Sequence, residues 1–329
     1  KEYGAPFQNL SALNVFLITL TLMVGTAGLP HVIIRFYTVP KASDARWSAG
    51  WALVFIGLLY TTAPAVAVFS KYNLLNTLAN KPVEEVRQID WVQKWEQTGL
   101  LKLQDKNGDG ILQMSANPDV NEVTIDRDII VLSTPEVAKL SPFIVGLVAA
   151  GGLAAALSTA AGLLIVIASA ISHDLYTRLI NPGASEATKL LIARVVIFLV
   201  VVLAAPFGIN PPAFIAQLVA FAFGLAASTF FPAILLGIFD RRMNMQGAVA
   251  GMIVGLVFTA SYIIGTKYLG WPNFILGITA EGIGAIGMLL NFVVAYLVSR
   301  ATPPPPEEIQ HLVDEIRIPK GSAGSALEH

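Results

Sequence analysis

Long apolar stretches dominate the chain, and short segments with charged or turn-forming residues separate them. A membrane-spanning helix needs about 20 consecutive apolar residues, because the hydrocarbon core of a bilayer is about 30 Å thick. By this criterion the sequence predicts seven membrane-spanning helices, at residues 9–37, 48–70, 141–172, 189–206, 212–238, 244–266 and 279–299. The expected fold class is therefore an all-α integral membrane protein.

The first apolar stretch contains helix-breaking residues near its middle. Gly25, Gly28 and Pro30 lie within residues 23–31. Proline has no backbone N–H and clashes with the preceding helical turn. Irregular backbone persists at membrane depth only where protein or a water-filled cavity satisfies the freed polar groups. We therefore predict that the first helix is broken, and that the break serves a function.

Composition agrees with a membrane protein and excludes several function classes. Of the 329 residues, 55% are hydrophobic and 13% are charged, whereas about 25% are charged in an average soluble domain. The net charge of −1 offers no broad basic surface, so we expect no nucleic-acid partner. The chain has no cysteine. The predicted spans contain no paired acids, Ser-His-Asp arrangement or metal-ligand cluster, and we therefore expect no enzymatic activity.

Basic residues are distributed unequally between the two sets of connecting segments. One set carries nine of them: Arg35, Lys41, Arg46, Arg178, Lys189, Arg194, Arg241, Arg242 and Arg300. The other set carries only Lys1 and Lys267. Because short cytoplasmic segments are enriched in Lys and Arg, we predict that the C-terminal tail is cytoplasmic and that residues 71–140 are extracytoplasmic.

The third span combines small residues with a pair of hydroxyl groups. Residues 151–162 are nearly all small, and small side chains allow another helix to approach closely. In a helix, Ser158 and Thr159 lie three and four positions after Ala155, so both hydroxyls are adjacent to the Ala155 carbonyl. Three oxygens on one patch suit a hard cation such as Na⁺, and unwound carbonyls of a facing broken helix can supply the remaining ligands. Close packing alone and cation binding both remain open.

Several segments of the sequence resemble the solute:sodium symporters, and within them the acetate permease branch of bacterial cation/monocarboxylate symporters. The matching segments are residues 25–31 (GTAGLPH), Arg35-Phe36, residues 154–162 (AAALSTAAG), residues 171–176 (ISHDLY) and Phe231-Pro232. The likeness extends from about residue 5 to residue 300. It implies a leucine-transporter-type inverted-repeat fold, with ten core helices in two halves and accessory helices after them.

On this resemblance the first five predicted spans look like core helices six to ten, followed by two accessory helices. Core helices one to five are then missing, and we expect them on the same chain or on another polypeptide. The resemblance implies a Na⁺ site at the Ala155 carbonyl and the Ser158 and Thr159 hydroxyls, completed by carbonyls of core helix one. It also implies a substrate site at the helix break.

The break residues expected to contact substrate are Gly25, Thr26, Gly28 and Pro30. Thr26 is small and polar, which suits a small substrate with hydrogen-bonding oxygens. The N–H groups where the second half-helix restarts carry partial positive charge and attract an anion. We therefore expect sodium-coupled symport of a small monocarboxylate, such as acetate, across the bacterial inner membrane by alternating access. A membrane sensor on a transporter scaffold and a structural or assembly subunit are the alternatives.

These elements predict five regions along the chain. They are the broken helix and following helix (1–70), an extracytoplasmic loop subdomain (71–140), core helices (141–238), two accessory helices (239–299) and a cytoplasmic tail (300–329). Residues 321–329 resemble an expression-tag linker.

The long connection at 71–140 shows two further patterns. Residues 90–103 have helical spacing. They are followed by Asp105, Asn107, Asp109 and Ile111, which reproduce the start of an EF-hand calcium loop. The pattern fails at its twelfth position, which is Ala116 instead of Glu. A weak Ca²⁺ site made of the three side chains and the Ile111 carbonyl, and a simple Asp/Asn/Gly-rich turn, are equally open.

Overall fold

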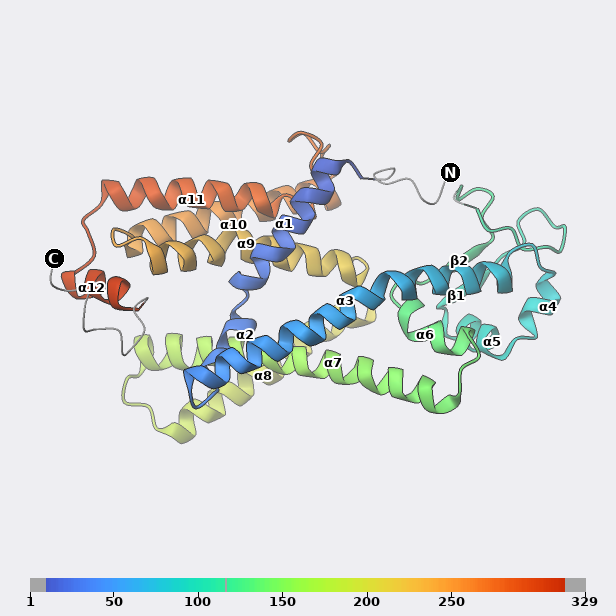
Figure 1. The fold of residues 1–329 in the computed structure, drawn as a ribbon, viewed down its shortest axis with the longest axis horizontal. Helices are drawn as coiled ribbons and strands as arrows, with labels where there is room; N and C mark the ends of the chain where they lie inside the picture. The colour runs from blue at the N-terminus through green and yellow to red at the C-terminus, as the bar shows by residue number, and fades with distance from the viewer. Residues whose placement is uncertain (1–9, 116, 317–329) are drawn as a thin grey trace. The chain divides into compact units, whose positions relative to one another are not determined.

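The chain divides into two compact units in the computed structural model, which describes residues 10–115 and 117–316 (Figure 1). Unit 1 contains residues 1–37 and 207–329, and unit 2 contains residues 38–206. Six helices of the described residues are long and apolar enough to cross a membrane, and a shorter apolar helix precedes them. The expected all-α membrane fold is confirmed. The expected linker at 321–329 lies outside the described residues.

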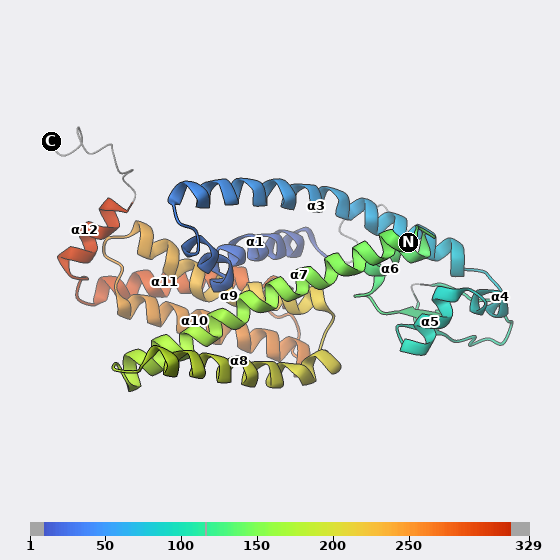
Figure 2. The same ribbon diagram turned by 90° about the horizontal axis from the view of Figure 1, so that it is seen from below.

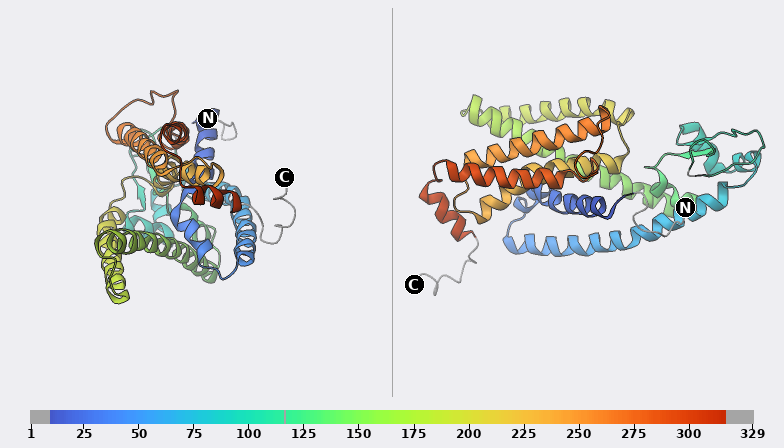
Figure 3. Two further views of the ribbon diagram at one scale, coloured as in Figure 1. Left: turned by 90° about the vertical axis from the view of Figure 1, so that its left-hand side faces the viewer. Right: turned by 90° about the horizontal axis from the view of Figure 1, so that it is seen from above.

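Unit 1 is a bundle of apolar helices. Its helices are α1 (Ala12–Gly28), α2 (Pro30–Ile33), the 3₁₀ helix η1 (Ile34–Tyr37), α9 (Ile215–Phe239), α10 (Met245–Tyr268), α11 (Gly284–Ala301) and α12 (Glu307–Glu315). Helices α9, α10 and α11 lie side by side, as two perpendicular views show (Figure 1, Figure 2). Helix α1 packs along α9 (Figure 3).

Glycines set the spacing between the helices of this bundle. Gly247, Gly251 and Gly255 recur every four residues on one face of α10, the spacing that allows close helix approach in membranes. A Cβ on Gly247 would lie 2.6 Å from the Ala295 carbonyl oxygen of α11, and one on Gly255 would collide with the Ser228 carbonyl of α9. Only glycine fits at these contacts.

The connection between α10 and α11 packs back onto α1. The Asn14 side chain donates to the Gly277 carbonyl at 3.0 Å and accepts from the Thr279 N–H at 2.8 Å. The Tyr262 hydroxyl donates to the Ile278 carbonyl at 2.7 Å. These bonds satisfy a buried stretch of irregular backbone, as burial requires, and attach it to the N-terminal part of α1.

Unit 2 contains three long apolar helices and a small folded segment between the first two. Its elements are α3 (Ala42–Leu78), α4 (Val83–Arg87), α5 (Asp90–Thr98), β1 (Leu101–Leu103), β2 (Val123–Ile125), α6 (Ile130–Val137), α7 (Pro142–Ser169), the π-helix η2 (Ala170–Ile180) and α8 (Glu186–Ile209). At 1.5 Å per residue the 37 residues of α3 measure about 56 Å, well beyond a bilayer core. The predicted boundary at residue 70 therefore falls inside this helix.

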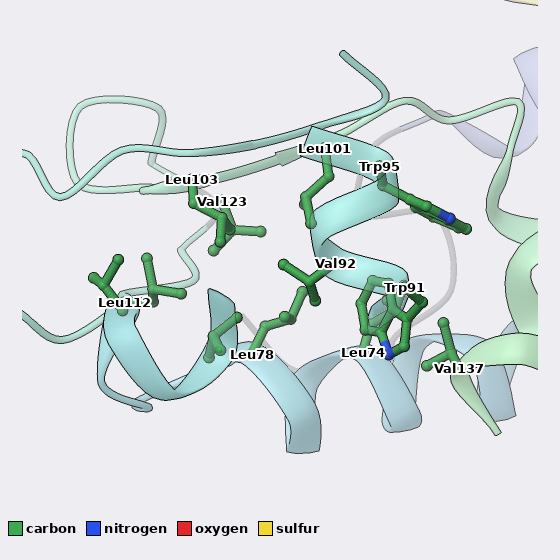
Figure 4. Packing of buried hydrophobic residues seen from close by; sticks show 12 residues of the cluster. Leu74, Leu78, Trp91, Val92, Trp95, Leu101, Leu103, Leu112, Val123 and Val137 are labelled. Atoms are coloured by element: carbon green, nitrogen blue, oxygen red, sulfur yellow. The ribbon is translucent and has the colours of Figure 1, made fainter. Parts of the chain in front are cut away.

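Residues 79–140, which we call the loop subdomain, fold on the last turns of α3 around a hydrophobic core (Figure 4). Its buried residues are Leu74, Leu78, Val83, Val86, Trp91, Val92, Trp95, Leu101, Leu103, Leu112, Val123 and Val137. The rings of Trp91 and Trp95 pack edge to face, with their centroids 5.4 Å apart. The connection is thus a small folded domain with its own core.

The helix predicted over residues 90–103 is wrong in its second half. Helix α5 ends at Thr98, because Gly99 adopts a left-handed conformation with φ of 76°, a common helix terminator. Leu101 and Leu103 then point into the core from β1, which pairs antiparallel with β2. Residues two positions apart lie on the same face of a strand, so both leucines are buried in this core.

Helix α7 also continues beyond the predicted end of its span at residue 172. The helix passes at Ser169 directly into the π-helix η2, which comprises the eleven residues Ala170–Ile180. The Thr177 hydroxyl donates to the Ser172 carbonyl, five residues back, at 2.8 Å. Wider turns of this kind are rare and occur mostly at functional sites. Residues 173–180, expected in a loop, are therefore helical.

We expect glycine contacts to limit the stability of unit 1. Gly247→Ala should lower the melting temperature of the purified protein in detergent, because its Cβ must displace α11. Gly237→Ala is the matched control, since a Cβ at Gly237 of α9 meets nothing within 4 Å. It should leave the melting temperature unchanged or slightly higher. Equal melting temperatures for both variants would contradict the close-packing explanation.

Candidate functional site

The three oxygens predicted to bind Na⁺ lie together on α7. The hydroxyls of Ser158 and Thr159 each donate to the Ala155 carbonyl oxygen at 3.0 Å. Because each hydroxyl directs its hydrogen into the helix, its oxygen can act toward a cation only as an electron-pair donor. The structure therefore brings the predicted oxygens into one cluster on the helix surface.

This oxygen cluster lies on a side of α7 that the described residues leave uncovered. Ala155, Ser158 and Thr159 are all exposed. We compared the share of buried residues in an 18-residue apolar stretch of each long helix. This share is 0% for α3, 6% for α7 with η2 and 6% for α8, but 33–39% for α9, α10 and α11. Any further ligands for a cation must therefore come from elements that pack onto α7.

A second cluster with the same local geometry occurs on α9. The hydroxyls of Ser228 and Thr229 donate to the Leu225 carbonyl at 3.1 and 2.6 Å. Here both side chains are buried, and the Asn291 side-chain amide of α11 donates to the Ser228 and Thr229 carbonyls. An N–H donor so close disfavours a cation. The same sequence pattern thus produces an accessible cluster on α7 and a closed one on α9.

The predicted break in the first helix is present. Helix α1 ends at Gly28, Leu29 is extended with φ of −81° and ψ of 114°, and α2 restarts at Pro30. Pro30 has no N–H for the Thr26 carbonyl, which instead accepts a long bond of 3.4 Å from the Leu29 N–H. The helix is therefore interrupted where the glycines and proline indicated.

The four predicted substrate-contacting residues lie on different sides of this break. A Cβ on Gly25 would collide with the Phe223 carbonyl of α9, and one on Gly28 would lie 2.7 Å from the Ala226 carbonyl. Both glycines are buried against α9, so the expectation that they border a substrate cavity does not describe their packing here. Thr26 is exposed, and Pro30 is partly exposed. Of the four, Thr26 is best placed to meet a ligand.

The restart of the helix after the break is shorter than the sequence suggested. Helix α2 has four residues and passes directly into η1. A helix dipole grows with the number of aligned peptide groups, so α2 provides little positive potential for an anion. The Thr26 hydroxyl, which donates to the Leu22 carbonyl at 2.8 Å, is the polar side chain at this face of the break.

The loop predicted as a candidate Ca²⁺ site uses its oxygens within itself. The Asp105 carboxylate accepts from the N–H groups of Gly108 and Gly110 at 2.7 and 2.9 Å. The Asp109 carboxylate accepts from the Ile111 N–H at 2.8 Å, and this bond holds the pKa of Asp109 below its ordinary value. The side chains thereby stabilise successive tight turns.

Glu122 provides the main anchor for this loop. It is buried, and its carboxylate accepts from the N–H groups of Lys106 and Gln113, both at 2.8 Å. Asn107 accepts from the Asp109 N–H at 2.9 Å and donates to the carboxylate of the same aspartate. The backbone N–H groups around this buried carboxylate supply the positive potential that a metal ion would otherwise supply.

Ca²⁺ binding by Asp105, Asn107, Asp109 and the Ile111 carbonyl is therefore not supported. Within residues 10–115 and 117–316, no group of three or more His, Cys, Asp or Glu side chains is arranged to hold a metal ion. The loop oxygens instead hold the loop in shape through N–H groups. Of the two alternatives open from the sequence, the structure favours the turn.

Three features of unit 1 escaped the sequence analysis although a signal was present. Gly247, Gly251 and Gly255 show the four-residue spacing of a close helix contact. Asn291 is an amide in the middle of an apolar span, and polar residues there are rare and paired. Ser228-Thr229 repeats the hydroxyl pair of α7. Each signal indicated helix contacts, but the partner helix could not be known without the tertiary structure.

Comparison with known proteins identifies relatives of the chain. Residues 114–255 match the model of the sodium:solute symporter family. Over 313 residues the chain is 41% identical to an uncharacterised symporter of Cupriavidus necator, an alignment that covers 93% of this chain and 45% of that protein. Over 268 residues it is 31% identical to a monocarboxylic acid transporter of Corynebacterium glutamicum, covering 78% of this chain and 39% of that protein.

These matches confirm the resemblance that the sequence motifs indicated. The chain spans less than half the length of these two relatives. Together with the six long apolar helices, the family match identifies a multi-pass membrane protein.

Glu122→Gln should destabilise the loop subdomain. The amide presents only one acceptor oxygen and places an N–H₂ group opposite a backbone N–H, so the loss is on the order of 1–3 kcal/mol. Circular dichroism melting of the purified protein measures it. Lys102→Gln on β1, whose side chain is exposed, is the control. Neither Ca²⁺ nor a chelator should shift the melting of the parent protein, and a clear shift would contradict the turn assignment.

Proposed function

We propose that this chain, which belongs to the sodium:solute symporter family, forms the C-terminal half of a sodium-coupled symporter for a small monocarboxylate such as acetate. The observation that carries the proposal is the oxygen cluster of Ala155, Ser158 and Thr159, which lies on a face of α7 that residues 10–115 and 117–316 leave uncovered. The relative from Corynebacterium glutamicum, a monocarboxylic acid transporter, supports the substrate class.

Sodium is the proposed coupling ion. Na⁺ is a hard cation that prefers oxygen ligands, and transporter sites assemble them from hydroxyls and backbone carbonyls of discontinuous helices. The α7 cluster supplies three such oxygens, and each of the two hydroxyl oxygens lies 3.0 Å from the Ala155 carbonyl oxygen. We infer that Ser158 and Thr159 bind the ion through their hydroxyl oxygens, and that their hydrogens turn away from the Ala155 carbonyl when this carbonyl also binds the ion.

The remaining ligands are proposed to come from an N-terminal half that contains core helices one to five. This chain covers 45% and 39% of the two relatives described above, which leaves room for such a half on the same or another polypeptide. Its helices would pack onto the small-residue face of α7. Carbonyls from its first helix would complete the Na⁺ site. This would explain why hydroxyls in an apolar span are left uncovered by the described residues.

The substrate is proposed to bind at the break between α1 and α2, on the side opposite α9. Thr26 is exposed there, next to the interrupted backbone at Leu29 and Pro30. Its hydroxyl, which donates to the Leu22 carbonyl in this structure, can rotate to donate to a carboxylate oxygen instead. The small size of threonine leaves room for an acid with few carbons. Gly25 and Gly28 contribute indirectly, because their contact with α9 holds the break in place.

The proposed setting is the bacterial plasma membrane, with the loop subdomain outside and the C-terminus in the cytoplasm. This orientation follows the excess of Lys and Arg in one set of connecting segments. Arg241 and Arg300 lie in that set, and both form ion pairs, with Asp314 and Asp240 respectively. The end of unit 1 that carries these two ion pairs would therefore face the cytoplasm.

Uptake into proteoliposomes tests the proposed function directly. The protein with both halves present is reconstituted, and uptake of radiolabelled acetate, propionate, pyruvate and lactate is measured with and without an inward sodium gradient. If the protein is a symporter, the uptake of at least one of these acids should depend on the sodium gradient. Absence of uptake for the whole panel would favour the sensor or the assembly subunit over a monocarboxylate transporter.

Ser158→Ala and Thr159→Ala should each raise the sodium concentration needed for half-maximal uptake several-fold. Loss of one hydroxyl leaves a cation short of a ligand in a site with little water, where the missing interaction is not replaced. Ser169→Ala is the matched control, because Ser169 is exposed on the same helix and donates to the Val166 carbonyl at 3.1 Å. If all three variants show the parental sodium dependence, the α7 pair serves helix packing.

Thr26→Val should raise the KM for the carboxylate by about tenfold, the loss expected for one hydrogen bond to a charged group. Valine keeps the shape of threonine, so insertion and stability should be preserved. Thr19→Val is the matched control: both threonines are exposed on α1, and each donates to the carbonyl four residues back at 2.8 Å. A parental KM in the Thr26 variant would place substrate recognition elsewhere.

A further inference from the structure

The hydrogen-bond ladder of α9 has a gap in the middle of the bundle. Pro232 lies inside α9 and is buried. In a regular helix its N–H would donate to the Ser228 carbonyl, four residues back, but proline has no N–H. Ser228 is fully buried, so solvent cannot replace the missing donor. A buried carbonyl without a partner is costly, and the gap therefore has to be filled from another element.

Asn291 of α11 fills this gap. Its side-chain nitrogen donates to the Ser228 carbonyl and to the Thr229 carbonyl, both at 2.8 Å. Both hydrogens of the amide are thus used on two consecutive carbonyls of α9. Asn291 itself has no exposed surface. A donor from a neighbouring helix takes the place of the backbone N–H that Pro232 lacks.

The surroundings of Asn291 are shaped to bring its amide to α9. A Cβ on Gly255 would collide with the Ser228 carbonyl, and a Cβ on Gly251 would collide with the Asn291 side-chain oxygen. That oxygen is buried without a hydrogen-bond partner among the described residues. An apolar side chain would avoid this cost. The arrangement therefore retains a polar side chain for its donor and accepts an unsatisfied oxygen.

The same turn of α9 supports the break in the first helix. Gly28, the last residue of α1, packs on this turn: its Cβ would lie 2.7 Å from the Ala226 carbonyl and 3.1 Å from the Phe231 nitrogen. The carbonyls bound by Asn291 belong to residues 228 and 229, between these two contacts. The end of α1 at Gly28 thus packs on the same two turns of α9 that contain the gap at Pro232.

We propose that Asn291 is a positioning residue for transport: by bonding to the Ser228 and Thr229 carbonyls it holds α9 in place around the missing backbone bond at Pro232, and this segment of α9 holds the α1 break in place. The inference rests on the proposed function in one respect, that the α1 break takes part in substrate binding. The hydrogen-bond replacement itself does not depend on that function.

The test combines Asn291→Leu with Pro232→Ala in the protein with both halves present. Asn291→Leu leaves the Ser228 carbonyl without a donor, so the melting temperature and the initial uptake rate should both fall. Pro232→Ala restores an N–H that can donate to Ser228 in a straight helix. The double variant should therefore recover most of the melting temperature while uptake remains low. Met288→Leu, a buried apolar exchange one turn away in α11, is the control and should match the parent.

A second readout is independent of the substrate. The chain has no cysteine, so Thr26→Cys provides a reporter at the break, and Thr19→Cys a reference on the same helix, with cysteines elsewhere in the protein replaced. The rate of maleimide labelling at position 26, relative to position 19, should change in Asn291→Leu and stay changed in the double variant. This result would hold even if the transported solute were not a monocarboxylate.

Two results would overturn the inference. Recovery of uptake and of the labelling ratio together with the melting temperature in the double variant would mean that Asn291 only fills a structural gap. Parental melting, uptake and labelling in Asn291→Leu would mean that the two bonds at 2.8 Å contribute nothing measurable. Failure of the proposed function is recognised separately, because the parent protein itself would then transport none of the acids.

Discussion

The membrane allows no backbone N–H or C=O group to remain without a partner, and most features of this chain follow from that constraint. In hydrocarbon, an unsatisfied polar group costs several kcal/mol. Long helices without an internal proline, such as α10, satisfy it locally. Where a helix is interrupted, another element has to supply the bond, as Asn291 does for the gap at Pro232. Irregular backbone therefore marks the places where helices depend on one another.

The two units meet this constraint in different ways. In unit 1, glycines bring α1, α9, α10 and α11 so close that a single Cβ would collide with backbone atoms of a neighbouring helix. The packing is complete enough to bury Asn291 and Thr259 without any exposed surface. In unit 2, α3, α7 and α8 bury little of their apolar surface against the described residues. The helices of unit 1 therefore pack mainly against one another, whereas α7 presents a surface suited to further helices.

The loop subdomain follows the rules of a water-soluble domain. Its tryptophans and aliphatic residues form a compact core, and its Asp, Asn and Glu side chains satisfy the turns around it. Side-chain oxygens have different roles in the loop subdomain and on α7, because different donors surround them. Oxygens in a polar, solvated loop are readily occupied by nearby N–H groups. On α7 the backbone N–H groups are already used by the helix, and the hydroxyl oxygens face outward.

Much of this architecture could be predicted from the amino-acid sequence, because each of the properties concerned is local. The apolar runs determine the spanning helices, Gly28 and Pro30 determine the break, and the spacing of Ala155, Ser158 and Thr159 places three oxygens on one patch. Contacts between helices are different, since they depend on which faces meet. The sequence contained Gly25, Asn291 and the second hydroxyl pair at Ser228, but only the tertiary structure decided that all three serve the packing of α9. The end of residues 90–103 was misassigned for the same reason: only the pairing of β1 with β2, and the core that buries Leu101 and Leu103, decided against a longer helix.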